Sequence, residues 1–203
     1  MPPQNQPQII LFHLQASRSI RIAWLLEALG LPYTVESSPR VNGVAPPDFK
    51  AKAGGLGTSD KYDQERRLLP PPGNPKRYEL LQWVHAAEGT YMVHALAVLY
   101  ARWFQKDGDV ARTEEGLSGN VVRDLDFLEQ ELGRAGEGRW LAGRSEFSVA
   151  DVAMQFSVEF ALTRELGTKG VEAGRWRRVL EWMGTCKGTG SWERAVERTG
   201  YEL

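Results

Sequence analysis

The first 36 residues combine two patterns that together define a βαβ unit. Residues 9–13 are a short apolar run rich in β-favouring side chains, and residues 33–36 are a second strand candidate. Between them, residues 20–29 are apolar at almost every position and end at Gly30, which predicts a buried helix. Two parallel strands joined by a helix need a right-handed crossover. The start of the chain therefore predicts an α/β domain.

The pattern changes after the proline run at residues 70–72, and no convincing strand follows. Apolar side chains then recur at helical spacing, and Gly89 is expected to bend the first of the helices. The predicted helices cover residues 78–88 continuing to 103, 117–132, 149–161, 176–183 and 192–197. The sequence predicts an α/β domain at residues 1–69 and an all-α domain at residues 75–203.

Composition narrows the classes of function. The 203 residues are 42% hydrophobic and 25% charged, which is typical of a globular protein and excludes disorder as the main state. The net charge of −1 gives no reason to expect a nucleic acid or a membrane as partner. One cysteine, Cys186, permits no internal disulfide, and residues 1–8 do not resemble a signal peptide. We therefore expect a cytoplasmic protein without a metal site.

The sharpest local motif is a capping box. Ser148 and Asp151 have the S-x-x-D spacing directly before an apolar helix, so each side chain can bond to the backbone amide of the other residue. This motif stabilises a helix and is not itself catalytic.

Three segments of the chain resemble the glutathione S-transferase superfamily. They are residues 141–144 with the capping box at 147–151, residues 12–14 with 17–27, and residues 81–89. The resemblance implies an α/β plus all-α fold: a thioredoxin-like domain, here apparently shortened, followed by an all-helical domain. It implies glutathione as the cofactor.

The resemblance also implies where the glutathione thiolate would lie. A hydroxyl at the N-terminal end of a helix stabilises such an anion, because the helix dipole and free amides act in the same direction. Ser17 is the first candidate, Ser19 the second and His13 the third, and Arg18 could attract a carboxylate of the peptide. The alternative is that both serines only cap the helix at Ile20.

A second substrate, a small hydrophobic electrophile, is expected in the family's cleft between the domains. The candidates for an apolar wall are Tyr91, Met92, Tyr100 and Trp103, although Tyr100 and Trp103 also suit a helical core. The resemblance implies a homodimer that performs conjugation, or cis–trans isomerisation of a conjugated double bond as in fungal secondary metabolism. The alternative is a non-catalytic interaction module of the same fold.

One segment departs from the family pattern. In the family, a stretch like residues 55–59 runs into a cis-proline, two further strands and a pair of residues that hold the γ-glutamyl end of glutathione. Here Ser59 is followed directly by Asp60. Two strands and one helix make an unstable sheet. We therefore expect either a break between Ser59 and Asp60 or a continuous chain in which residues 43–67 repack against the strand edge or remain loosely ordered.

Overall fold

The computed structural model describes residues 8–52, 63, 65–134, 140–172 and 174–203. The chain divides into two compact units. Unit 1 contains residues 1–64 together with the C-terminal residues 188–203, and unit 2 contains residues 65–187. The domain ranges 1–69 and 75–203 stay a prediction.

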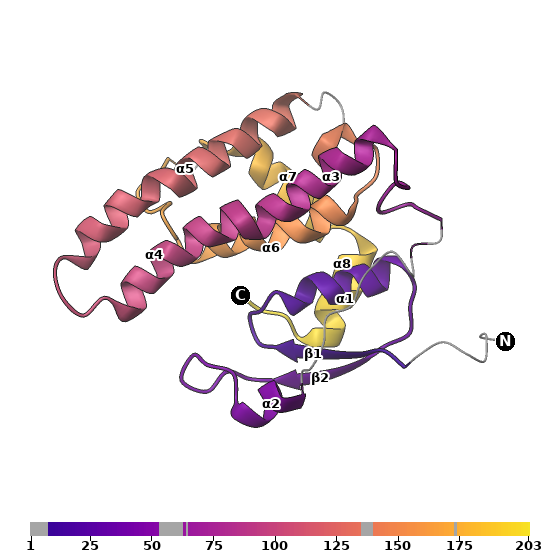
Figure 1. Cartoon of the computed structure of the whole chain (residues 1–203), viewed down its shortest axis with the longest axis horizontal. Helices are drawn as coiled ribbons and strands as arrows, with labels where there is room; N and C mark the ends of the chain where they lie inside the picture. Colours follow the sequence, from indigo (N-terminus) through magenta and orange to yellow (C-terminus); the bar gives the residue numbers. More distant parts are fainter. Residues whose placement is uncertain (1–7, 53–62, 64, 135–139, 173) are drawn as a thin grey trace. The chain divides into compact units, whose positions relative to one another are not determined.

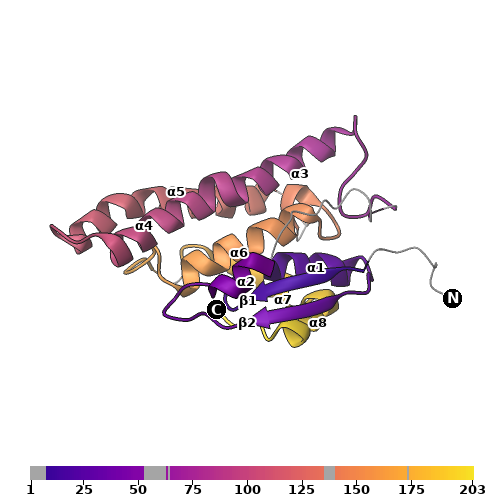
Figure 2. The same cartoon turned by 60° about the horizontal axis from the view of Figure 1, so that its bottom comes forward.

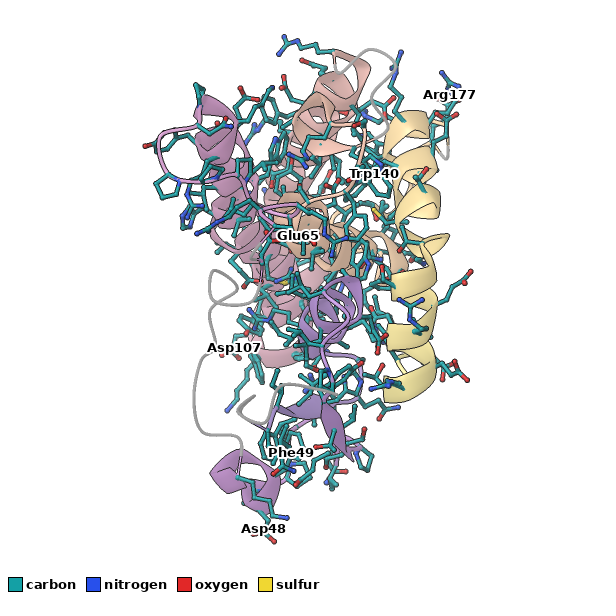
Figure 3. All side chains as sticks on the ribbon, turned by 90° about the vertical axis from the view of Figure 1, so that its right-hand side faces the viewer. Asp48, Phe49, Glu65, Asp107, Trp140 and Arg177 are labelled. Atoms are coloured by element: carbon teal, nitrogen blue, oxygen red, sulfur yellow. The ribbon has the colours of Figure 1, made fainter. Side chains whose placement is uncertain are left out.

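Unit 1 contains the βαβ unit that the sequence predicts. Strand β1 (Ile10–Leu14) pairs in parallel with β2 (Thr34–Ser38), and helix α1 (Ser19–Ala28) connects them. Figure 2 shows the two strands side by side and pointing in the same direction. The short helix α2 (Pro47–Lys52) places Phe49 near β1, where its ring meets Phe12 edge-on with centroids 6.0 Å apart (Figure 3).

The C-terminal helix α8 (Gly190–Thr199) belongs to the same unit and runs beside α1 (Figure 1). The ring of Trp24 packs edge-on against Trp192, and its indole N–H donates to Ser191 Oγ over 3.0 Å. Glu27 forms an ion pair with Arg194. The fully buried Trp24 is therefore covered by residues more than 160 positions away in the sequence.

Unit 2 is all-helical, as predicted. Its first helical segment continues from α3 into α4 through Gly89, which lies in a π-helical turn. Figure 1 shows α4 and α5 running side by side. The elements are α3 (Pro75–Ala86), η1 (Ala87–Met92), α4 (Val93–Phe104), α5 (Val110–Arg134), the 3-10 turn η2 (Leu141–Gly143), α6 (Val149–Thr163) and α7 (Arg177–Lys187).

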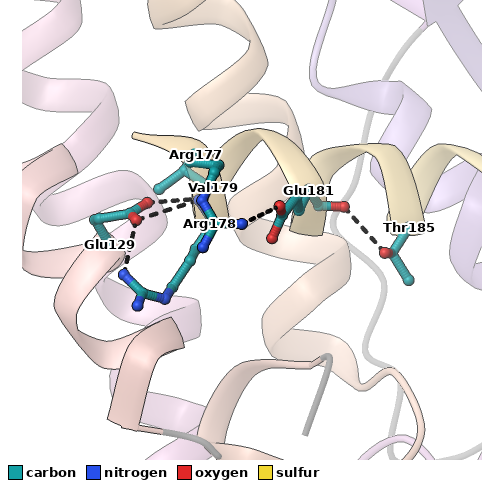
Figure 4. Close-up of polar contacts among 6 residues, drawn as sticks. All are labelled: Glu129, Arg177, Arg178, Val179, Glu181 and Thr185. Carbon is teal, nitrogen blue, oxygen red and sulfur yellow. Dashed lines mark hydrogen bonds and ion pairs between the residues drawn. The ribbon is translucent and has the colours of Figure 1, made fainter. Parts of the chain in front are cut away.

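Helix α7 turns one face into the core of unit 2. Val179, Trp182 and Cys186 on this face are buried, whereas Leu180 is 45% exposed. The α5 side chain of Glu129 holds the start of this helix, since it accepts the backbone N–H groups of Arg178 and Val179 at 3.2 and 3.0 Å (Figure 4). A carboxylate at a helix start satisfies free amides and complements the dipole.

The capping box is present, and it belongs to a larger buried network. Asp151 Oδ2 accepts from the backbone N and the hydroxyl of Ser148, both at 2.9 Å. Asp151 Oδ1 accepts from Leu141 N at 3.0 Å and from the indole N–H of Trp182 at 2.9 Å. One fully buried carboxylate thus joins η2, α6 and α7.

Among the described residues, no helix is both long and apolar enough to cross a membrane. The expected break between Ser59 and Asp60 lies outside the described residues.

Replacing Asp151 should test the network directly. Asp151→Ala leaves three buried N–H donors without an acceptor, so we expect a loss of at least about 3 kcal/mol in the free energy of unfolding. The matched control is Asp109→Ala, which removes a single exposed bond to Arg112 N and should cost about 1 kcal/mol or less. Urea denaturation measures both; equal losses would contradict the network.

Candidate functional site

Three side chains meet where β1 ends and α1 begins. Ser17 Oγ lies 2.6 Å from Ser19 Oγ, and Ser19 Oγ lies 2.9 Å from His13 Nδ1. His13 is buried near the end of β1, and Ser19 is the first residue of α1. The structure therefore brings the three hydroxyl and imidazole candidates from the sequence into one hydrogen-bonded chain.

Neither serine occupies the N-cap position of α1. That position is Arg18, whose side chain makes no capping hydrogen bond. Ser17 Oγ accepts from Ser19 N at 3.4 Å, a long contact, and Ser19 Oγ turns to His13 instead. Simple capping therefore does not account for the two hydroxyls.

The loop between β1 and α1 is held from the neighbouring strand. Gln15 N donates to Ser38 O at 3.0 Å, and Arg40 Nε donates to Gln15 O, also at 3.0 Å. Ala16 has φ = 50°, in the left-handed region that alanine rarely adopts. Such a conformation persists only where the surroundings impose it, and the contacts from β2 do so here.

His13 is 2% exposed, and no hydrogen bond reaches its Nε2 atom in the described part of the chain. Burial lowers the pKa of His13 below its ordinary value of 6.5. The imidazole is therefore neutral at pH 7, and its one polar contact is with Ser19.

In unit 2 the four candidates for an apolar wall fall into two pairs. Tyr91 and Met92 are buried in η1, and the Tyr91 hydroxyl donates to Asp124 O on α5 at 2.8 Å. Burial and the nearby Asp124 raise the pKa of Tyr91 above its usual range. His94 Nδ1 also contacts Asp124, at 2.6 Å from Oδ2. These contacts join α4 to α5.

Tyr100 and Trp103, in contrast, are 49% and 59% exposed near the end of α4. The Phe104 ring contacts both, with its centroid 5.7 Å from that of Tyr100 and 6.1 Å from that of Trp103. The three side chains form an exposed aromatic cluster that is large enough to pack against a small apolar molecule.

Comparisons with known proteins agree on one fold. The chain is similar to a glutathione S-transferase from Actinobacillus pleuropneumoniae, with 24% identity, a TM-score of 0.76, and coverage of 97% of this chain and 94% of that one. It is similar to the glutathione transferase URE2P8 from Phanerochaete chrysosporium, solved with oxidised glutathione, with 17% identity, a TM-score of 0.73 and 96% coverage of both chains. The chain has the glutathione S-transferase fold.

The sequence comparison points in the same direction. Glutathione S-transferase 3 of Schizosaccharomyces pombe is 28% identical to this chain over an alignment of 213 residues. The match covers 88% of this chain and 85% of that protein. No protein-family model matches the chain. The resemblance to the glutathione S-transferase superfamily, stated above from three sequence segments, is thereby confirmed.

Sequence reasoning missed Arg40, which holds the loop of this glutathione S-transferase fold. One signal was available, because parallel strands end at the same edge of a sheet and so place the residues after β2 beside the loop after β1. Phe104 was missed as well, although its neighbours Tyr100 and Trp103 were named.

Unit 2 also contains a small cavity. It has a volume of about 180 Å³, lies near Trp140 (labelled in Figure 3) and is lined by Trp83, Phe127, Glu79 and Glu131. Lys76 pairs with Glu79 and Arg134 with Glu131, so both carboxylates already have partners. No group of three or more histidine, cysteine or acidic side chains could hold a metal among the residues that the structure describes.

Burial of His13 predicts a pH dependence of stability. The folded-state pKa is lowered, so between that value and about 6.5 the unfolded chain binds more protons than the folded chain. Stability is therefore full above about pH 6.5 and falls as the pH drops toward the folded-state pKa. The urea midpoint of unfolding should fall more between pH 7.5 and pH 5.0 in the wild type than in His13→Asn, because asparagine does not titrate. Equal falls would contradict the prediction, and replacement of the exposed His85 of α3 by Asn serves as the control.

Proposed function

We propose that this chain binds glutathione at the loop between β1 and α1 and uses the glutathione thiolate on a small hydrophobic electrophile. The observation that carries the proposal is the half-buried Ser17 hydroxyl, which lies beside the start of α1 and is linked to a buried imidazole through Ser19. The transferase names of the similar proteins support it.

Ser17 is the better of the two serines for this role. The Ser19 hydroxyl contacts both His13 and Ser17, whereas the side-chain contact that the structure describes for the Ser17 hydroxyl is with Ser19. A hydroxyl at this end of α1 can donate to an anion where the helix dipole also favours negative charge. Arg18, exposed at the N-cap, supplies a cation for a carboxylate of the peptide.

The aromatic cluster of Tyr100, Trp103 and Phe104 is the surface that we assign to the electrophile. Tyr91 and Met92 are buried in η1, which leads into α4, and the Tyr91 hydroxyl donates to Asp124 O on α5. Their part is to support the helix that carries the cluster. Apolar rings suit a substrate that carries a conjugated system.

Two reactions share the same first step, in which the thiol proton passes to solvent. In conjugation, the sulfur lone pair forms an S–C bond and the leaving group departs with its bonding electrons. In isomerisation, sulfur adds to a conjugated double bond, which becomes a rotatable single bond. Loss of the thiolate restores the double bond, so no glutathione is consumed. We place either reaction in the cytoplasm, and isomerisation in secondary metabolism.

Replacing Ser17 tests the role of its hydroxyl. Ser17→Ala should lower thiol-dependent turnover about 10- to 100-fold, the worth of a hydrogen bond to a charged group, while unfolding free energy changes by about 0.5 kcal/mol or less. The matched control is Ser37→Ala, an exposed serine on β2 in the same unit. Turnover that survives Ser17→Ala and is abolished by Ser19→Ala would move the catalytic role to Ser19.

Calorimetric titration with glutathione separates an enzyme from an interaction module. Binding by the wild type that weakens in Ser17→Ala supports the proposal. A complete absence of binding favours the non-catalytic module. The shortened segment at Ser59 and Asp60 in the sequence also favours that role.

We further propose a homodimer that forms through α3 and α4. Tyr78 and Val93, at 64% and 53% exposure, are apolar side chains on these helices that an interface would cover. Light scattering should give twice the chain mass at micromolar concentration, and Val93→Glu should shift the equilibrium to the monomer. A monomer mass for the wild type would contradict the dimer.

A further inference from the structure

The hydrogen-bonded chain of His13, Ser19 and Ser17 can run in either of two directions. Each hydroxyl donates one hydrogen and accepts others, while a neutral imidazole donates from one ring nitrogen and accepts at the other. If His13 Nδ1 accepts, then Ser19 donates to it and Ser17 donates to Ser19. The Ser17 hydroxyl hydrogen is then not available to a ligand. If His13 Nδ1 donates, the order reverses and the Ser17 proton is free.

The surroundings of His13 favour one direction. Its Nε2 atom is buried without a hydrogen-bond partner in the described part of the chain. Burial also lowers the pKa of His13, so the ring carries one hydrogen rather than two. A buried N–H group without an acceptor is rarer in proteins than a buried acceptor without a donor. The hydrogen therefore belongs on Nδ1, which has an acceptor 2.9 Å away in Ser19 Oγ.

We infer that His13 is a positioning residue: its Nδ1–H donates to Ser19, Ser19 donates to Ser17, and the Ser17 hydroxyl hydrogen is left to donate outward to an anion. This inference rests on the proposed function, because the anion it serves is the glutathione thiolate. In this arrangement the buried imidazole orients the hydroxyl hydrogens of Ser19 and Ser17 without contacting the ligand itself.

The direction matters because a thiolate can only accept. With Nδ1–H on His13, Ser17 presents a hydrogen to the sulfur, and each preceding bond strengthens the next one. With the opposite direction, Ser17 presents an oxygen lone pair to the sulfur, and the interaction becomes repulsive.

Nitrogen NMR of the free protein tests the tautomer without any ligand. The chain has three histidines, so spectra of ¹⁵N-histidine protein and of the variants His85→Asn and His94→Asn assign the ring signals of His13. At pH 7.5 we expect Nδ1 to carry the hydrogen and Nε2 to be bare. A hydrogen on Nε2, or on both nitrogens, would overturn the inference.

The second test measures the pKa of the bound glutathione thiol from thiolate absorbance. His13→Leu should raise that pKa by about 1 relative to the wild-type complex, because the outward donor is no longer fixed. His13→Asn should recover most of the effect, since its amide N–H can stand near the Nδ1 position. His85→Leu, at an exposed position of α3, is the control. A wild-type thiol pKa in folded His13→Leu would overturn the inference.

A third variant keeps the test decisive if His13→Leu does not fold. Ser19→Ala removes the middle hydroxyl and should raise the thiol pKa to the same extent, while Ser19→Thr, which keeps the hydroxyl, should not. A purely structural role would lower the melting temperature without moving the thiol pKa. If the wild type binds no glutathione, the proposed function fails, and the NMR measurement alone still decides the direction of the chain.

Discussion

The carboxylate of Asp151 is the contact on which the rest of unit 2 depends. It lies in the first turn of α6 and is fully buried, yet no cation pairs with it among the contacts that the structure describes. Burial raises the pKa of this group, and four donated hydrogen bonds oppose that rise. Because the donors come from η2, α6 and α7, the three segments must take their places together. A helix start that looks local in the sequence is therefore a tertiary junction.

Unit 1 solves a different problem. Two parallel strands and one helix bury too little surface to be stable alone, and the sequence gives no further strand. The structure supplies the missing cover from the other end of the chain, since α8 packs on α1 through Trp24 and Trp192 and through the pair of Glu27 with Arg194. The expectations for a break at Ser59 and Asp60 or for repacking or loose order of residues 43–67 did not consider this helix.

These two cases show what the sequence could predict. The βαβ start, the helices after Pro75 and the capping box follow from local periodicity and spacing, so they could be predicted. The bond of Asp151 to Trp182 spans 31 positions and that of Trp24 to Ser191 spans 167, and no local pattern encodes either of them. The start of α7 likewise depends on a distant contact, because Glu129 on another helix accepts the backbone N–H groups of Arg178 and Val179.

The candidate site combines both kinds of information. The residue types Ser17, Ser19 and His13 were visible in the sequence, but their connection was not. Residues two apart on a helix do not face each other, so the serines could not meet if α1 began earlier. They meet because Ser17 lies outside the helix, after the left-handed Ala16, while Ser19 opens it. The start of α1 is therefore the constraint that turns two neighbouring serines and a buried histidine into one connected group.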